Sequence, residues 1–382
     1  MKVVNICLAG PFSDGWSYQE NILTKFQKNF ADVSVVTSQY SWNDKGNLVK
    51  KQESNYTNCD GVKIYRIPMK NNQNLNSKFK RYQGLYEVLK KLSPDVLFIH
   101  GCQFCDVSTI VKYLRTHPNV VTYVDNHADF SNSATNWISK NILHKIIWRY
   151  YAQRINPFVK KWYGVLPARV DFLKDVYRLP ADKIEFLPMG ADDIFVEKYS
   201  HPEGRLEYRK KYGIGEDDQL IVTGGKIDLA KKQTLLLMDA VNQIGNSKLK
   251  LIVFGSVVSE LKDEIEKRCS DKVKYIGWLS SEESYPHFAM ADLVAFPGRH
   301  SVFWEQVAGM GIPMVVKYWE GTTHIDRGGN VKFLQNDSVE EIKKSIEEIL
   351  IKGKLGNMKK NAENCKNFFS YSKIAQRSIC NL

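Results

Sequence analysis

The residues with the clearest chemical potential lie at 298–313, in the run Gly-Arg-His-Ser-Val-Phe-Trp-Glu-Gln-Val-Ala-Gly-Met-Gly-Ile-Pro. Ser301 is a good N-cap and Gly311 a good C-terminal residue, so a helix is predicted between them. Glu305 would then lie one turn into the helix. The amides of a helix start suit a diphosphate, and a carboxylate just behind them suits two ribose hydroxyls. The run therefore has the layout of a nucleotide-sugar site.

A second candidate is the basic turn at 224–232, Gly-Gly-Lys-Ile-Asp-Leu-Ala-Lys-Lys. Lys226 and Lys231 flank the turn, Gly225 allows a close backbone approach, and a helix is predicted at Gln233–Ala240. Two cations beside a helix start would neutralise a diphosphate leaving group. The alternative is a solvated basic turn without a ligand.

Two further strand ends carry residues compatible with a ligand. One strand ends in Gly255 and Ser256, where a glycine permits a close approach of the backbone. The next ends near Trp278 and Leu279, which could form a wall for a nucleobase, although Trp278 by itself is more typical of a core. The carboxyl ends of parallel strands meet at one edge of a sheet, so we expect these candidate ligand-binding residues to lie together.

The first half holds a polar cluster after the apolar run Val120–Val124. His127 is the candidate catalytic histidine, and Asp125 and Asp129 are close enough in sequence to tune it or to orient an acceptor. A loop histidine with satisfied hydrogen bonds is the alternative. His100 follows the preceding strand and is a candidate acceptor contact.

Cys102 and Cys105 have redox or zinc spacing, but no second cysteine pair accompanies them. Packing of small side chains at a strand-to-helix turn is therefore the favoured interpretation. Seven scattered cysteines fit a reducing compartment better than a disulfide framework.

Short β-branched runs alternate with longer helical patterns, which predicts parallel sheets with crossover helices. The expected strands are 3–8, 33–37, 62–67, 96–99, 120–124, 163–166 and 184–187, then 220–223, 249–254, 273–276, 293–296, 314–316 and 331–334. The N-terminus is expected to be the first strand rather than a signal peptide. We predict two doubly wound α/β domains, 1–188 and 189–382, with a C-terminal helix after about residue 366 packing back on the first. Residues 71–77 are expected to form a loop.

Charge is divided unequally between the halves. Residues 1–190 carry 26 Lys and Arg against 15 Asp and Glu, a net charge of +11, and residues 191–382 carry 28 against 27, a net of +1. This excess favours an anionic partner for the first half. No run of eighteen apolar residues predicts a membrane-spanning helix.

Residues 130–170 contain seven cations and no carboxylate, interleaved with aromatic residues. Ile138, Ile142, Ile146 and Tyr150 recur at helical spacing, as a stripe facing the core would. Membrane-surface contact and single-stranded nucleic-acid binding are the other interpretations. We expect part of the segment to be core and part a membrane surface, with no nucleic-acid partner.

The second half resembles the donor-binding domain of the GT-B glycosyltransferases, specifically the retaining family 4. The basic pair Lys226 and Lys231 is similar to the pair that contacts the donor diphosphate in that family. Glu305 with the following small-residue helix is similar to its ribose-binding glutamate, and 188–192 to its interdomain Pro-Asn-Gly-Val-Asp element. The segment 291–297 resembles the one before the family signature. In the first half, 10–18 resembles the glycine-containing loop after the first strand.

This resemblance implies two Rossmann-like domains facing a cleft, with no cofactor and no metal. It assigns His127 to a contact with the transferred sugar, Gly15 to the donor and Trp16 to the acceptor. The family usually places a second glutamate eight positions before the ribose one, where this chain has Pro297. His300 is a candidate to make the missing contact, beside Ser301, or is a helix-start residue without a ligand.

From the resemblance we expect transfer of a sugar from a nucleoside diphosphate, UDP favoured over GDP, to a hydroxyl of a glycan. The expected acceptor is carried on a polyprenyl diphosphate at the cytoplasmic face of a bacterial membrane, in capsule, O-antigen or exopolysaccharide synthesis. The protein is expected to be a peripheral cytoplasmic one. A nucleotide-sugar 2-epimerase of the same fold, a nucleic-acid-binding protein and a non-catalytic nucleotide-binding scaffold remain alternatives.

Overall fold

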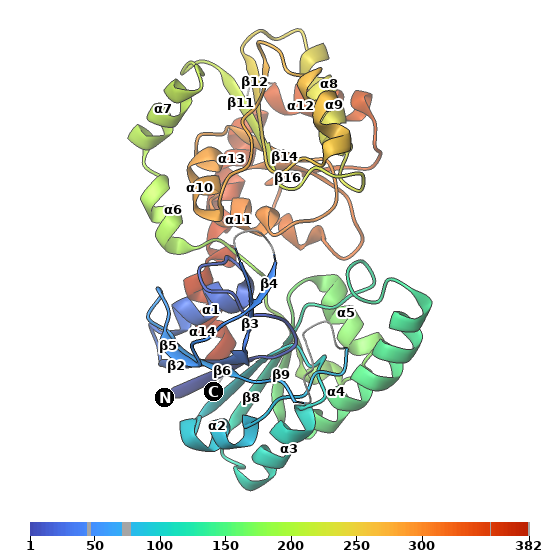
Figure 1. Ribbon diagram of the computed structural model, residues 1–382. Helices are drawn as coiled ribbons and strands as arrows, with labels where there is room; N and C mark the ends of the chain where they lie inside the picture. The colour runs from blue at the N-terminus through green and yellow to red at the C-terminus, as the bar shows by residue number, and fades with distance from the viewer. Residues whose placement is uncertain (44–46, 71–77, 352, 381–382) are drawn as a thin grey trace. The chain divides into compact units, whose positions relative to one another are not determined.

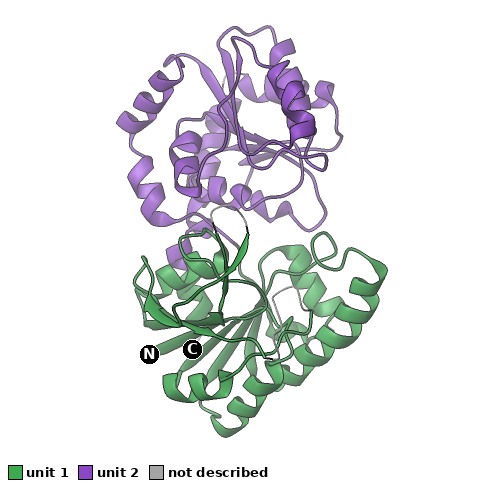
Figure 2. Ribbon diagram, in the orientation of Figure 1, with its two compact units in different colours: residues 1–188, 374–382 green, residues 189–373 purple. Residues whose placement is uncertain are grey.

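The computed structural model describes residues 1–43, 47–70, 78–351 and 353–380. The chain divides into two compact units, one of residues 1–188 with 374–382 and the other of residues 189–373 (Figures 1 and 2). Each unit has a mainly parallel sheet with helices between the strands, which confirms the predicted fold class. The loop expected at 71–77 lies outside the described residues. Among the helices of the described residues, none is both long enough and apolar enough to cross a bilayer.

Unit 1 is built on an eight-stranded sheet of order β10-β9-β8-β7-β1-β2-β6-β5, in which β5 runs antiparallel to β6 and the other neighbours are parallel. A separate pair, β3 and β4, is antiparallel. The strands of unit 1 are β1 (Lys2–Cys7), β2 (Asp32–Ser38), β3 (Tyr40–Trp42), β4 (Leu48–Lys50), β5 (Asn55–Thr57), β6 (Lys63–Ile67), β7 (Val96–His100), β8 (Val121–Asn126), β9 (Val159–Gly164) and β10 (Ile184–Phe186).

The helices of unit 1 are α1 (Gln19–Gln27), α2 (Leu85–Leu92), α3 (Val107–Thr116), the π-helix η1 (Ser139–Trp148), α4 (Arg149–Ile155), η2 (Asn156–Phe158), α5 (Pro167–Asp175) and η3 (Ala181–Lys183). The last helix, α14 (Tyr371–Ile379), begins in unit 2 and ends in unit 1. The strand predicted at 163–166 is displaced towards the N-terminus, because Leu166 is already the N-cap of α5 and Pro167 its first residue.

Unit 2 has a six-stranded parallel sheet of order β13-β12-β11-β14-β15-β16. Its strands are β11 (Gln219–Gly224), β12 (Leu249–Phe254), β13 (Val273–Tyr275), β14 (Leu293–Phe296), β15 (Met314–Lys317) and β16 (Val331–Leu334). Its helices are α6 (Asp193–Tyr199), α7 (Pro202–Lys211), α8 (Gln233–Gln243), η4 (Ser259–Leu261), α9 (Lys262–Glu266), α10 (Ser281–Ala289), α11 (Phe303–Gly309), η5 (Thr323–Ile325), α12 (Val339–Leu350), α13 (Lys354–Cys365) and η6 (Lys366–Phe369).

Both sheets contain a point where the strand order reverses. In unit 1 the chain leaves β1 towards β2 on one side and later adds β7, β8 and β9 on the other. In unit 2 it leaves β11 towards β12 and later adds β14, β15 and β16. Connections on opposite faces part at such a reversal and leave a crevice beyond the carboxyl ends of the strands, where open α/β sheets bind ligands. The polar residues at these two places are therefore candidates for ligand binding.

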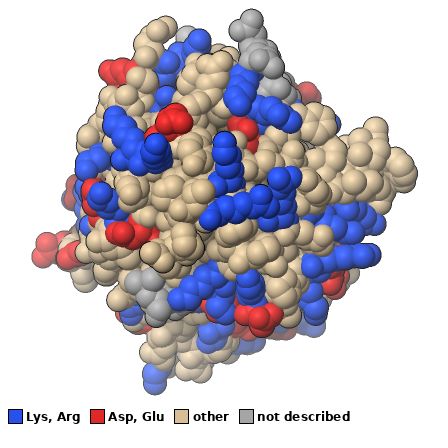
Figure 3. All heavy atoms as spheres, turned by 90° about the horizontal axis from the view of Figure 1, so that it is seen from below, with Lys and Arg blue, Asp and Glu red and all other residues tan. Residues whose placement is uncertain are grey.

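Basic residues are prominent on the surface. Figure 3 shows one face on which Lys and Arg are spread widely among uncharged residues and Asp and Glu are fewer. This distribution agrees with the net charge of +12 for the whole chain. A surface of this sign attracts anionic ligands over distances of about 10 Å at moderate ionic strength.

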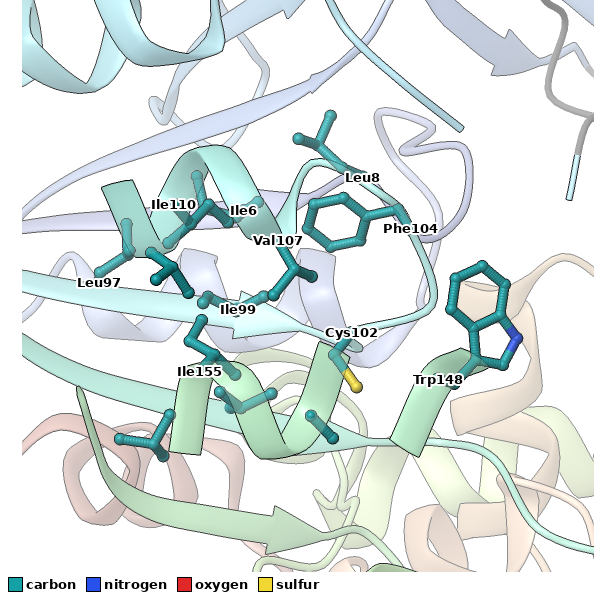
Figure 4. Close-up of a cluster of buried hydrophobic side chains, with 14 of the residues drawn as sticks. Ile6, Leu8, Leu97, Ile99, Cys102, Phe104, Val107, Ile110, Trp148 and Ile155 are labelled. Atoms are coloured by element: carbon teal, nitrogen blue, oxygen red, sulfur yellow. The ribbon is translucent and has the colours of Figure 1, made fainter. Parts of the chain in front are cut away.

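Cys102 belongs to the hydrophobic core of unit 1, together with Ile99, Phe104 and Trp148 (Figure 4). Burial raises the pKa of the Cys102 thiol to about 12, so it is protonated and unreactive at neutral pH. Cys105 is buried as well, and both are free thiols. The packing interpretation of this cysteine pair is confirmed.

In the segment 137–150 the structure differs from the prediction of a stripe that faces the core. Ile138, Ile142, Ile146 and Tyr150 do not face the core but are exposed, and the buried residues of η1 are Ser139, Leu143, His144 and Trp148. The exposed residues recur every four positions, and the buried ones lie one or two positions after the exposed isoleucines. Spacing alone identified a stripe but not the side of the helix that is covered.

Candidate functional sites

The carboxyl ends of β11 and β12 lie against each other in unit 2. A Cβ atom at Gly255 would lie 1.8 Å from the carbonyl oxygen of Gly225, and both residues have positive φ angles, of 126° and 121°. Only glycine fits this contact. The close approach at Gly255 is therefore one between two strand-end loops, whereas the sequence had suggested one to a ligand.

Three cations gather beside these loops. Lys226 Nζ lies 3.3 Å from Asp228 Oδ2 and is mostly exposed, while Lys231 is partly buried. Burial lowers the pKa of Lys231, and the nearby charges of Lys226 and Arg299 lower it further against the opposing effect of Asp228. Lys231 thus interacts with two other cations and with the Asp228 carboxylate at the point where β11 and β14 adjoin. An excess of positive charge of this kind suits a polyanionic ligand.

Helix α11 differs from its predicted form. It spans Phe303–Gly309 with Val302 as N-cap, while the Ser301 hydroxyl accepts a hydrogen bond of 3.3 Å from the Phe303 amide. Gly311 has a φ of 71° just beyond the helix, as predicted for a terminating glycine. The helix has only seven residues, so the predicted contribution of its N-terminal amides to anion binding is small.

Glu305 is fully buried between two histidines. Its Oε1 accepts hydrogen bonds from His300 Nε2 at 2.8 Å and from His324 Nε2 at 2.9 Å. Burial by itself would raise the pKa of Glu305, but the two histidines outweigh burial and lower it to about 2. The carboxylate is therefore ionised, and each histidine presents an N–H to it. Its other oxygen, Oε2, is buried and has no hydrogen-bond partner among the described residues.

His324 escaped the sequence reasoning. It lies in η5, seven residues after the end of β15, and β15 is the strand next to β14 in the sheet. Ligand-binding residues follow the ends of parallel strands, and the segment 318–324 after β15 is such a place, which is the signal that points to this histidine.

The remaining predicted donor residues lie at the same edge of the sheet. Ser256 is exposed after β12. Trp278 is 69% exposed after β13, so the alternative that this side chain belongs to the core is wrong. Leu279 is partly buried and packs against the hydrophobic core of unit 2. An exposed tryptophan beside two glycine-rich turns offers a flat apolar face to a planar ring.

In unit 1, the strand ends bring together three of the predicted residues. Asp125 Oδ2 lies 2.8 Å from His100 Nδ1 and 3.2 Å from His127 Nε2, while its Oδ1 accepts from the Gly101 amide at 3.1 Å. Burial opposes ionisation, but His100 and His127 hold the pKa of Asp125 well below its usual range. His127 therefore donates its Nε2 proton to Asp125, and its side chain is 36% exposed.

A buried chain of hydrogen bonds sets the protonation of His100. Ser378 Oγ donates to the Ala375 carbonyl and accepts from Gln27 Nε2 at 3.0 Å. Gln27 Oε1 accepts from Asn5 Nδ2 at 2.8 Å, which leaves Asn5 Oδ1 to accept from His100 Nε2 at 3.0 Å. His100 thus carries a proton on Nε2, and its Nδ1 faces the ionised carboxylate of Asp125.

His100 is consequently held as an imidazolium. Burial disfavours its charge, yet the Asp125 carboxylate raises the pKa of His100 above its ordinary value. The residues that fix this state, Asn5, Gln27 and Ser378, come from β1, α1 and α14, and no sequence motif had marked them. One could find them only by knowing which elements pack together.

The same three residues could also hold a metal ion, since one ligand atom of each of His100, Asp125 and His127 lies within 4.8 Å of the others. Two imidazoles and a carboxylate are suitable ligands for zinc. However, Asp125 when ionised can accept from both imidazoles and Asn5 accepts from His100 Nε2, so these hydrogen bonds are satisfied without an ion.

Asp129 does not contact His127 through its carboxylate, as Asp125 does, but binds residues of the following loop and Arg169. Its carboxylate accepts hydrogen bonds from the Ser131 amide and hydroxyl and pairs with Arg169 Nε at 3.0 Å. Asn132, in the same turn, donates to the His127 carbonyl at 2.7 Å. Asp129 therefore shapes the loop that carries His127, and the predicted direct tuning of that histidine falls to Asp125.

Gly15 and Trp16 lie in the loop after β1. Gly15 is exposed with a φ of 74°, and Trp16 is partly exposed. Arg66, which is buried, holds the loop by donating to the Phe12 carbonyl at 3.1 Å and pairing with Asp14 at 3.2 Å. A loop that is anchored from below can present an exposed backbone to a ligand.

Comparison with known proteins agrees with this arrangement. Residues 204–365 match the family "Glycosyl transferases group 1". A GDP-mannose-dependent alpha-(1-6)-phosphatidylinositol monomannoside mannosyltransferase of Mycobacterium tuberculosis is 25% identical over 187 residues, which are 45% of this chain and 48% of the relative. The match thus spans about half the length of that curated relative.

Solved structures share the fold over the whole chain. The crystal structure of HepE of Anabaena in complex with UDP superposes with a TM-score of 0.70 at 15% identity, over 99% of this chain and 98% of HepE. The UDP-GlcNAc 2-epimerase of Neisseria meningitidis gives 0.62 at 13% identity, over 99% and 98%. Likeness at this identity establishes the fold. Residues 204–365, most of unit 2, are thus similar to the group 1 glycosyltransferases, and the whole chain shares the fold of these solved structures.

Proposed function

We propose that the protein is a retaining, metal-independent glycosyltransferase that moves a sugar from a nucleoside diphosphate, with UDP favoured, to a hydroxyl of a glycan acceptor. Unit 2 would bind the donor and unit 1 the acceptor. The observation that carries the proposal is the cluster of Lys226, Lys231 and Arg299, in which Asp228 pairs with Lys226. These cations would neutralise the diphosphate as it departs.

The surroundings of the buried Glu305 suggest that Glu305 contacts the ribose and His300 the sugar. His300 is slightly exposed and is held by Glu305 Oε1, so it would present its other ring nitrogen to the donor. This position is compatible with His300 replacing the acid that is absent at Pro297. Glu305 Oε2 has no partner among the described residues and would be the oxygen left to reach a ribose hydroxyl.

His127 would contact the transferred sugar, with Asp125 fixing its ring. In a retaining transfer the departing diphosphate can accept the proton of the acceptor hydroxyl, so no protein base is needed. The dyad could alternatively act as a general base, because an ionised aspartate that binds one ring nitrogen of a histidine orients the other. That chemistry would invert the configuration at the anomeric carbon, and the product distinguishes the two routes.

The proposed acceptor is a glycan on a lipid carrier, in the synthesis of a bacterial capsule, O-antigen or exopolysaccharide. The Mycobacterium relative is described as acting on a phosphatidylinositol monomannoside, which is a lipid-borne acceptor. The basic excess of residues 1–190 suits such an acceptor and an anionic bilayer. We place the protein at the cytoplasmic face of the membrane on these grounds.

Epimerisation of a nucleotide sugar is the second candidate, because a UDP-GlcNAc 2-epimerase shares the fold. That reaction needs no acceptor. It would yield a free or epimerised sugar from UDP-GlcNAc in water, whereas a transferase turns over rapidly only when an acceptor is added.

The test is a panel of UDP- and GDP-sugars scored for thermal stabilisation, slow hydrolysis and transfer, with Glu305→Ala beside the wild type and with EDTA in one arm. Stabilisation by one nucleotide sugar, weakened in Glu305→Ala and unaffected by EDTA, is the expected result. Proton NMR of the product should show retained configuration. If no nucleotide sugar stabilises the protein, or only nucleic acid does, the transferase proposal fails.

A further inference from the structure

The outward face of η1 and α4 carries an unusual set of side chains. Trp137 is 69% exposed, Ile138 56%, Ile142 38%, Ile146 61% and Tyr150 54%, all within 14 residues. We call these five residues the exposed stripe. The opposite face of the same helices packs into the core of unit 1 through Leu143, Trp148, Ala152 and Ile155. The stripe is therefore a second apolar face on helices whose inner face is already covered.

Cations accompany the exposed stripe. Lys140 Nζ lies 4.8 Å from the ring centroid of Phe130, which is itself 49% exposed. Arg154 donates to the Tyr150 hydroxyl at 2.6 Å and lies 5.8 Å from its ring. Residues 130–170 contain no carboxylate at all. Long cationic side chains beside exposed aromatic and aliphatic groups are typical of helices that lie in a membrane interface.

We propose that the exposed stripe docks this protein on an anionic phospholipid bilayer, with the apolar side chains entering the headgroup boundary and the flanking cations binding lipid phosphates. This inference deepens the proposed function, because it names the surface that would bring the enzyme to a lipid-linked acceptor. It does not need the transfer reaction to be observed.

Charge and shape argue against other partners for the exposed stripe. A twofold dimer through this face would place the patch against its own copy and bring like charges together. Single-stranded nucleic acid binds by stacking bases on aromatic rings, whereas the middle of the stripe is three isoleucines. An anionic bilayer satisfies both the aliphatic and the cationic groups.

The experiment is co-sedimentation of the full chain with phosphatidylcholine vesicles, prepared with and without phosphatidylglycerol. Two variants test the stripe: Ile142→Ser with Ile146→Ser, and Lys140→Gln with Arg154→Gln. Their matched controls change exposed residues of unit 2: Ile194→Ser with Leu206→Ser, and Lys210→Gln with Lys262→Gln.

Wild type should bind phosphatidylglycerol vesicles and bind phosphatidylcholine vesicles far less. The apolar variant should lose affinity by about tenfold. The charge variant should lose about 25-fold and respond less to salt, since each of its two cations near an anionic surface contributes about fivefold. Both controls should bind like wild type.

Equal binding by wild type and both stripe variants would overturn the inference. So would a dimer, seen by sedimentation equilibrium, that Ile142→Ser with Ile146→Ser dissociates while no vesicle binding occurs. Thermal stabilisation by nucleotide sugars, measured on the same proteins, separates the two proposals. If vesicles do not bind but nucleotide sugars stabilise, only this inference fails; with the reverse result, only the proposed function does.

Discussion

Glu305→Gln isolates the charge of the buried carboxylate, because glutamine keeps the side chain's size and its acceptor oxygen. In the wild type, Glu305 Oε1 accepts from both His300 and His324, and the side chain is fully buried. Its pKa is about 2, below the ordinary value of 4.5. Each unit of pKa corresponds to about 1.4 kcal/mol, so the ionised carboxylate contributes roughly 3 kcal/mol to the stability of the folded state.

The sign of the pH dependence follows from the lowered pKa. The contribution of Glu305 is fully present above the pKa of the unfolded chain, near 4.5, and is lost as the pH falls towards about 2. At pH 7 we therefore expect Glu305→Gln to lower the free energy of unfolding around α11 by about 3 kcal/mol. The difference from wild type should shrink below about pH 4.

Hydrogen exchange followed by mass spectrometry measures this locally, on peptides that cover 303–309, without assuming that both units unfold together. Glu266→Gln, at an exposed position of α9, is the matched control and should change nothing. If Glu305→Gln exchanges as slowly as wild type at pH 7, the carboxylate is not an ionised partner of the two histidines, and the proposed support of His300 is refuted.

Three other substitutions test separate parts of the account. Asp125→Asn should destabilise unit 1 by about 3 kcal/mol, because it leaves His100 without its counter-charge. Calorimetry against pH should show that only the wild type loses stability as the pH rises through the raised pKa of His100. The same pH profile in both proteins would contradict the ion pair. Gly255→Ala should prevent unit 2 from folding, since its Cβ would meet the Gly225 carbonyl oxygen at 1.8 Å, and soluble protein with a native circular dichroism spectrum would refute that packing. Trp278→Ala should leave the melting temperature nearly unchanged because the side chain is 69% exposed, yet weaken nucleotide binding about tenfold by fluorescence titration if the ring stacks on the base.

Much of the fold was predictable because parallel strands in covered sheets are short, strongly apolar and bounded by polar turns. The strands at 249–254, 293–296 and 331–334 begin and end where expected. The strand-end rule also located His100, Asp125 and Glu305 correctly at sheet edges. Such predictions succeed because they depend on local pattern and on one general property of parallel sheets.

The failures concern contacts made by distant parts of the chain. The recurrence of Ile138, Ile142, Ile146 and Tyr150 is typical of a core face, yet these side chains are exposed, because a pattern of spacing cannot tell which side of a helix is covered. His324 joins Glu305 from 19 residues away, and Ser378 sets the state of His100 through two amides of distant elements. Neither pairing leaves a periodic signal in the sequence.

The central claim is that unit 2 binds a nucleoside diphosphate through its cation cluster. Isothermal titration of UDP and GDP into wild type and into Lys231→Ala with Arg299→Ala measures this most directly. We predict that one diphosphate binds the wild type with an affinity that falls as salt rises, and that the double variant binds at least about tenfold more weakly while it melts at the same temperature. Equal affinity in the double variant, or no binding of either diphosphate to the wild type, would contradict the account.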